Sequence, residues 1–169
     1  MRREPTEIFR SGCGTFCYAA TTHVKSGVRK MLRPGAYRHV ANRASDLVLI
    51  VDDYDHTREM YAEFLEFSGF RVAEAGTGGF AIRTAQERLP ALVVMDLSLP
   101  DMPGWEAAKV LRRDARTMDI AIIAVTAFSR THARDVALRA GCDVFLEKPI
   151  PPNALADQIA GLLRRKRRS

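Results

Sequence analysis

Residues 47–51 read LVLIV and are followed at once by Asp52 and Asp53, and this junction decides the class of fold. Five consecutive aliphatic residues with no polar face predict a strand that is buried on both sides. The segment that follows spaces its apolar residues like an amphipathic helix, and Gly69 is its expected stop. Its apolar positions include Met60, Phe64, Leu65 and Phe67.

The same alternation of a short apolar run and a helical segment continues along the chain. Further strands are expected at 70–73, 91–95, 120–125 and 144–146, and further helices at 78–89, 105–114, 130–140 and 153–163. Parallel strands need crossover connections, and those crossovers are usually helices. We therefore predict an α/β fold, a doubly wound parallel sheet of five strands with five helices.

Length, composition and cysteine content exclude several classes of protein. The chain has 169 residues, of which 47% are hydrophobic, which suits one core. No apolar stretch reaches the roughly 18 residues of a membrane span, and no signal-peptide core is present. Cys13, Cys17 and Cys142 are too few for a disulfide framework, so we expect a cytoplasmic protein. Cys13 and Cys17 with His23 and His39 match no common zinc-site spacing.

The net charge of +6 divides unevenly along the chain. Residues 1–45 hold nine Lys/Arg and two Asp/Glu, whereas residues 46–163 hold twelve Lys/Arg and eighteen Asp/Glu. The C-terminal tail, 164–169, carries five consecutive basic residues. The sequence thus predicts an acidic domain at 46–163 between a basic, disordered or partly ordered extension and a basic tail.

Polar residues directly follow four of the five predicted strands. They are the pair Asp52 and Asp53, then Asp96, Thr126 and Lys148. Each one alone is typical of an ordinary turn, but the carboxyl ends of parallel strands meet at one edge of a sheet. Carboxylates gathered there repel one another unless a cation lies between them, and hard oxygen ligands favour Mg²⁺ or Mn²⁺. The sequence therefore predicts a phosphate-directed metal site.

The residues around these positions form four short motifs. The motifs are VDD at 51–53, MDLSLPDMPG at 95–104, VTA at 125–127 and EKP at 147–149. In order and spacing they resemble the receiver domain of two-component response regulators, over about residues 46–163. The resemblance implies the flavodoxin-like strand order 2-1-3-4-5. It also implies a phosphoacceptor that assists its own phosphotransfer and dephosphorylation, rather than an enzyme acting on a separate substrate.

By this resemblance, Asp96 is the phosphoacceptor, which attacks the phosphorus of a phosphohistidine and becomes a 4-aspartylphosphate. Asp53, Asp96 and the backbone carbonyl of Ser98 would bind Mg²⁺ (or Mn²⁺) directly, and Asp52 would contact the metal through a water. The metal would offset charge on the transferring phosphoryl group.

The resemblance also assigns roles to residues on the last two strands. Lys148 would place its ammonium against phosphoryl oxygens, with a cis peptide bond before Pro149. Thr126 would hydrogen-bond the phosphoryl group, and Phe145 would then turn inward as the second switch residue. Plain packing of Phe145 in the core is an equally open interpretation.

We expect a stand-alone response regulator in a phosphorelay, because the residues after Lys148 leave no room for a second domain. Its partners would be a histidine kinase or histidine-phosphotransfer protein and a downstream protein that contacts the last two helices and the last strand. An alternative is a nucleic-acid-associated regulator that acts through its basic ends. A receiver that works without phosphorylation is a further alternative. A haloacid-dehalogenase phosphatase is disfavoured, because Ser98 occupies the position of its second Asp.

Overall fold

The computed structural model describes residues 46–127 and 132–168. Strands and helices alternate throughout, as predicted. The strands are β1 (Leu47–Val51), β2 (Arg71–Ala75), β3 (Leu92–Asp96), β4 (Ala121–Thr126) and β5 (Val144–Glu147). The helices are α1 (Asp55–Phe67), α2 (Gly78–Arg88), α3 (Gly104–Arg113), α4 (Ala133–Arg139) and α5 (Pro152–Lys166).

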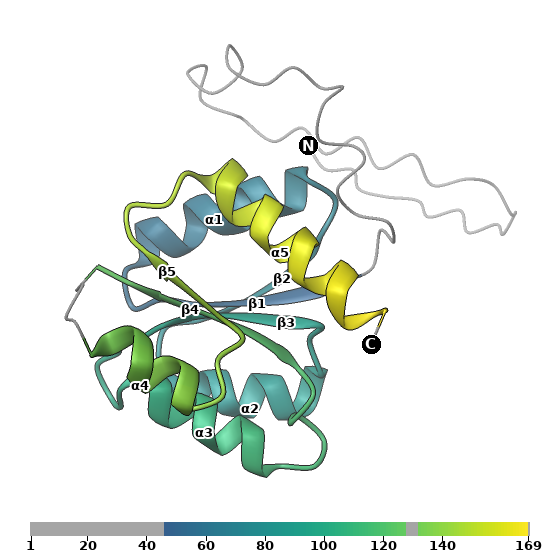
Figure 1. Ribbon diagram of the computed structural model, residues 1–169. Coiled ribbons are helices and arrows are strands. Elements are labelled where there is room, and N and C mark those ends of the chain that lie inside the picture. The colour runs from purple at the N-terminus through teal and green to yellow at the C-terminus, as the bar shows by residue number, and fades with distance from the viewer. Residues whose placement is uncertain (1–45, 128–131, 169) are drawn as a thin grey trace, which may run out of the picture. The chain divides into compact units, whose positions relative to one another are not determined.

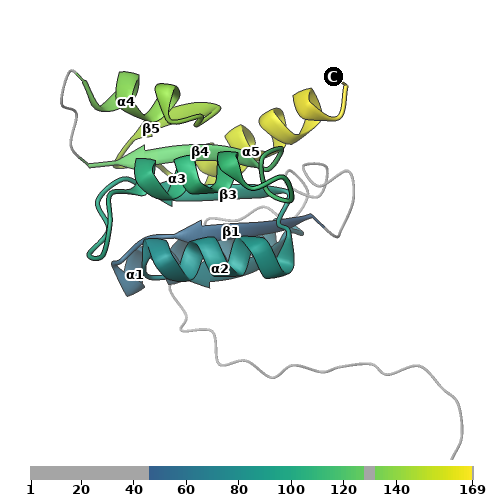
Figure 2. The same ribbon diagram turned by 90° about the horizontal axis from the view of Figure 1, so that it is seen from below.

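The five strands form one parallel sheet in the order β2-β1-β3-β4-β5. Helices α1 and α5 cover one face of this sheet, and α2, α3 and α4 cover the other (Figure 1). The view from below shows the second layer of helices in front of the strands (Figure 2). The arrangement confirms the predicted doubly wound α/β fold and the flavodoxin-like strand order.

The three central strands are buried at every position, which explains why their sequences lack polar residues before the last residue of the strand. Alternate side chains of β1 pack on opposite faces of the sheet, because strand side chains have a period of two. Leu49 and Val51 join the cluster beneath α2, α3 and α4, and Val48 and Ile50 join the cluster beneath α1 and α5. Strands β2 and β5 form the edges and are partly exposed.

The start of β2 and the buried face of α1 differ from the expected ones. Strand β2 begins at Arg71, because the backbone N–H of Phe70 donates to the Leu65 carbonyl and still belongs to the end of α1. Met60 and Phe67 are exposed, at 44% and 56%. The helix is turned so that Tyr61, Ala62 and Leu65 face the sheet instead.

Helix α5 begins one residue earlier and ends three residues later than predicted, so its last turn contains Arg164, Arg165 and Lys166. Arginine and lysine are good helix formers, and cations are favourable beside the negative end of a helix. The predicted helix at 130–140 is seen as α4 in the described residues, since 128–131 lie outside them. The basic extension at 1–45 also lies outside them. Within the described residues, no helix has the length and apolar character needed to cross a membrane.

Candidate functional site

Three carboxylates meet at one edge of the sheet. Asp52 directly follows β1 and Asp96 ends β3, and these strands are neighbours, so their carboxyl ends lie side by side. One carboxylate oxygen from each of Asp52, Asp53 and Asp96 lies within 4.8 Å of the others. Asp52 and Asp96 are buried, whereas Asp53 is exposed. The sheet topology therefore brings together the acidic residues that the sequence places far apart.

Lys148 reaches this cluster from beyond the end of β5. Its Nζ atom lies 2.6 Å from Oδ2 of Asp52 and 2.5 Å from Oδ2 of Asp96. Its backbone N–H donates to the Thr126 carbonyl at 2.8 Å, and the following bond to Pro149 is cis, as predicted. Burial lowers the pKa of Lys148, but hydrogen bonds and Coulombic attraction from Asp52 and Asp96 outweigh it and hold the pKa above its usual value.

The remaining oxygens of the two buried carboxylates accept backbone hydrogen bonds. Oδ1 of Asp52 accepts from the Tyr54 N–H at 2.9 Å, and Oδ1 of Asp96 accepts from the Ser98 N–H at 2.8 Å. Each of these carboxylates is thus fixed between a backbone N–H and the Lys148 ammonium. Fixed donors and acceptors of this kind favour one orientation of the acceptor group.

The charges and donor atoms of the cluster fit a divalent cation. Three carboxylates and one ammonium leave two negative charges in excess, and every anionic group supplies hard oxygen. No cysteine or histidine belongs to the described cluster, which disfavours zinc or copper. The acidic group of Asp52, Asp53 and Asp96 is typical of the metal site of a receiver domain.

Arg58 also supports the site, although the motifs do not include it. Its Nη1 donates to the Asp52 backbone carbonyl at 2.8 Å, and it pairs with Asp55 at 2.5 Å and Glu74 at 3.2 Å. The guanidinium thus ties the loop after β1 to α1 and β2. A basic residue on the second turn of a helix that follows an acidic pair is the only sequence signal for this contact.

The loop after β3 is held by Gly104 and Asp101. A Cβ atom on Gly104 would lie 2.0 Å from the Asp96 carbonyl oxygen, so only glycine fits there. The Asp101 carboxylate accepts from the N–H groups of Gly78 and Gly79, each at 2.8 Å. The bond from Gly79, more than any other interaction, lowers the pKa of Asp101. Both residues therefore fix the backbone around Ser98, and the sequence gives no separate indication of either contact.

Thr126 and Phe145, the predicted switch residues, lie on the neighbouring strands β4 and β5. Thr126 is buried and lines a hollow of about 570 Å³ with Met102 and Trp105. Phe145 is half-buried and packs with Met102 and Trp105 against the core beneath α2, α3 and α4. Its role as a switch stays a prediction beside its role in packing.

Comparisons with known proteins give the same assignment. A family model described as the response regulator receiver domain matches residues 48–160. The response regulator Rre1 of Synechocystis sp. is 37% identical over 123 residues, which are 72% of this chain and 53% of that protein. The polar-differentiation response regulator DivK of Brucella ovis is 33% identical over 103 residues, which are 61% of this chain and 84% of that protein.

A solved structure supports the match in three dimensions. The crystal structure of a CheY-like response regulator receiver domain protein from Methanospirillum hungatei aligns with a TM-score of 0.69 and 28% identity. The alignment covers 73% of this chain and 97% of that one. The chain spans about half the length of the first curated relatives that it matches. With the fold, the acidic cluster and the family model in agreement, the chain belongs to the response regulator receiver domain family of two-component signalling.

Proposed function

We propose that Asp96 is the residue that accepts the phosphoryl group. Members of this family are phosphoacceptors rather than classical enzymes, and membership implies a kinase as partner. The observation that carries the proposal is the shared environment of Asp96, whose carboxylate lies beside two further carboxylates and the Lys148 ammonium. A carboxylate with one oxygen fixed by the Ser98 N–H is oriented to act as a nucleophile.

In the proposed reaction, a carboxylate oxygen of Asp96 attacks the phosphorus of a phosphohistidine. An oxygen–phosphorus bond forms as the nitrogen–phosphorus bond breaks, and the imidazole leaves with the electron pair. Lys148 already hydrogen-bonds Asp96, so its ammonium is placed to attract the incoming phosphoryl oxygens. Thr126, which is buried at the end of β4, would donate a hydrogen bond from its hydroxyl to the aspartyl phosphate.

The proposed cofactor is Mg²⁺, with Mn²⁺ as the substitute. Asp53, Asp96 and the Ser98 carbonyl would hold it directly, and Asp52 would hold it through a water. When bound, the ion offsets negative charge on the phosphoryl group during transfer. The two excess negative charges of the cluster support this assignment.

We also propose that the chain is a stand-alone regulator, which passes its signal by protein contact near α4, β5 and α5. The DivK relatives support the first part, because the chain covers 84% of their length. Signalling through this surface is supported by the register between β4 and the edge strand β5, because Thr126 of β4 pairs with Glu147 of β5. A change at Thr126 would therefore act next to a partly exposed edge strand.

The experiment is to incubate the full chain with Mg²⁺ and either acetyl phosphate or phosphoramidate, and to measure the intact mass. We expect one added phosphoryl group, loss of the addition in Asp96→Ala and with excess EDTA, and normal addition in Asp157→Ala. Asp157 is a matched control, because it is an exposed carboxylate of α5 far along the chain from the cluster. Addition that persists in Asp96→Ala would show that the acceptor is wrong. No addition to the unsubstituted chain would favour a receiver that works without phosphorylation.

A further inference from the structure

A surface rich in arginine lies at the end of the sheet opposite the acidic cluster. Arg71 begins β2 and Arg88 ends α2, so both lie at the amino ends of the strands. Both are exposed, and together with Asp46 and Leu89 they line a hollow of about 480 Å³. Because Asp52, Asp96 and Lys148 stand at the carboxyl ends of the strands, the two sites are separated by the length of the sheet.

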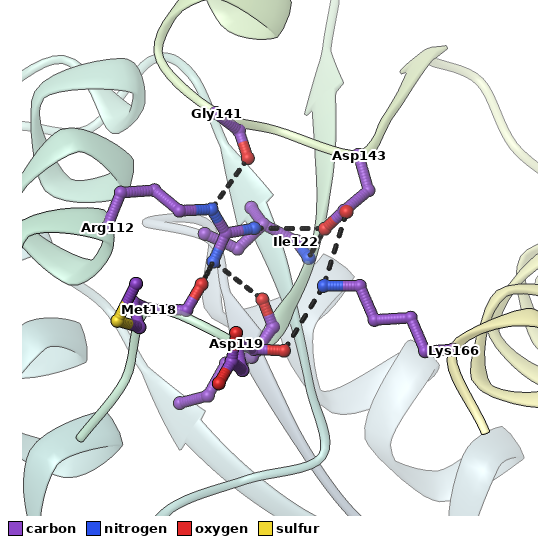
Figure 3. Close-up of polar contacts among 8 residues, drawn as sticks. Arg112, Met118, Asp119, Ile122, Gly141, Asp143 and Lys166 are labelled. Carbon is purple, nitrogen blue, oxygen red and sulfur yellow. Dashed lines mark hydrogen bonds and ion pairs between the residues drawn. The ribbon is translucent and has the colours of Figure 1, made fainter. Parts of the chain in front are cut away.

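The last turn of α5 reaches the same end of the sheet. Arg167 pairs with Asp46, which lines the hollow between Arg71 and Arg88. Lys166 donates to the Asp119 carbonyl at 3.1 Å and pairs with Asp143 at 3.3 Å (Figure 3). These contacts fix the basic end of the helix beside the hollow. We call the resulting surface the basic pole, which comprises Arg71, Arg88, Arg164, Arg165, Lys166, Arg167 and Arg168.

The basic pole has more cationic groups than its own carboxylates can pair. Asp46 is paired with Arg167, and Asp143 is paired with both Arg112 and Lys166. Four guanidinium groups make no hydrogen bond or ion pair with any residue that the structure describes. They belong to Arg71, Arg88, Arg164 and Arg168.

The sequence carries a further excess of positive charge before Asp46 in chain order. Residues 1–45, with nine Lys/Arg and two Asp/Glu, join the described domain at Asp46, which is part of the hollow. The rest of the domain is acidic, and its clustered carboxylates lie at the other end of the strands. A polyanion would therefore be attracted to the basic pole and repelled from the acidic cluster.

Two features favour nucleic acid over a membrane as the polyanion. Six of the seven cationic side chains of the basic pole are arginine, whose planar guanidinium matches phosphate oxygens with two parallel hydrogen bonds. The apolar side of α5 faces the core through Leu155, Ile159 and Leu163, so this helix has no apolar face to insert among lipids. We propose that the basic pole binds the phosphate backbone of nucleic acid without reading its base sequence.

The test is fluorescence anisotropy of a short, labelled, mixed-sequence DNA duplex with the full chain, at about 50 to 200 mM sodium chloride. The pole variants are Arg71→Gln/Arg88→Gln and Arg164→Gln/Arg168→Gln. The matched control, Arg83→Gln/Arg134→Gln, removes the same charge from exposed residues of α2 and α4 outside the basic pole. Circular dichroism establishes that each variant is folded.

Each lost phosphate contact reduces the slope of log affinity against log salt by about 0.9, so each pole variant should lose about 1.8 in slope. At 100 mM salt its affinity should fall roughly tenfold or more, while the control stays within about twofold. Absence of duplex binding by the unsubstituted chain would overturn the proposal. So would an Arg71→Gln/Arg88→Gln variant that binds like the control, because binding would then belong to the basic residues at the two ends of the sequence alone. Tighter binding to phosphatidylserine vesicles than to the duplex would assign the surface to membranes instead.

Discussion

Arg112 should make a large contribution to stability, because its side chain bonds four residues on two loops and so joins both loops to α3 (Figure 3). Its Nε donates to the Gly141 carbonyl at 2.9 Å, and its Nη1 donates to the carbonyls of Met118 at 2.9 Å and Ile120 at 2.7 Å. Its Nη2 pairs with Asp143 at 3.0 Å. The informative change is Arg112→Met, which keeps the length of the aliphatic stem and removes every donor.

The expected loss follows from the number and exposure of these bonds. A hydrogen bond contributes about 0.5–1.5 kcal/mol net, and bonds from charged donors contribute more. The Arg112 side chain is 20% exposed, so its ion pair with Asp143 counts for at most about 1 kcal/mol. Asp143 also keeps its bond from the Ile122 N–H, so its carboxylate is not left without a donor. Together the four contacts predict a loss of about 3 kcal/mol.

Urea unfolding followed by circular dichroism measures this loss. With a slope of about 1.5 kcal/mol per molar urea, the midpoint should fall by about 2 M. The matched control is Arg113→Met, since Arg113 is the next residue of α3, is exposed, and its side chain makes no hydrogen bond with a described residue. The control should change stability by less than about 0.5 kcal/mol. A loss below about 1 kcal/mol in Arg112→Met, or an equal loss in both variants, would refute the argument.

Two further predictions concern a glycine and a carboxylate. Gly104→Ala should slow Mg²⁺-dependent labelling by acetyl phosphate at least about tenfold, because the added Cβ would displace the Asp96 backbone. The control is Gly161→Ala, in which the added Cβ meets only Arg164 at 3.9 Å. This variant should be labelled at the normal rate. Equal rates in the two variants would show that the close approach is unimportant. Hydrogen bonds from the Arg116 side chain lower the pKa of Asp114 to about 2. The ionised Asp114 carboxylate therefore stabilises the fold fully above the unfolded pKa of about 3.9, and this stabilisation is lost as the pH falls toward 2. The stability difference between the unsubstituted chain and Asp114→Asn should therefore be constant from about pH 6 to 5 and shrink below about pH 4 in urea titrations; a constant difference down to pH 3 would contradict it.

Sequence patterns were sufficient for the strands and for the acidic cluster, for one physical reason. The three central strands are buried on both faces and must be apolar, so the polar residue at the end of each of them marks its carboxyl end. Asp52 and Asp96 could be predicted to meet because those ends share one edge of the sheet. The buried face of α1 was less predictable, since Met60 and Phe67 are apolar residues that the helix leaves exposed.

Contacts between loops could not be predicted in the same way. Arg58 donates to the Asp52 carbonyl, and Arg112 donates to carbonyls in the loops that precede β4 and β5. No periodic pattern in the sequence connects these donors to their acceptors. The basic pole could be predicted from the sequence only in part. The sequence shows the basic run at the end of the chain, but only the fold places it beside Arg71 and Arg88.

The two ends of β5 explain how stability and phosphoacceptor chemistry can be separated. Among the strands that the structure describes, this edge strand pairs only with β4, and its start is held by Asp143, which bonds both Arg112 and the Ile122 N–H. Its other end is held by Lys148, whose backbone donates to Thr126 and whose side chain bonds Asp52 and Asp96. Because those last contacts do not involve Arg112, the folded fraction of Arg112→Met should still accept phosphoryl from acetyl phosphate at low temperature. Loss of labelling in the folded variant would instead show that the position of Lys148 depends on both ends of the strand.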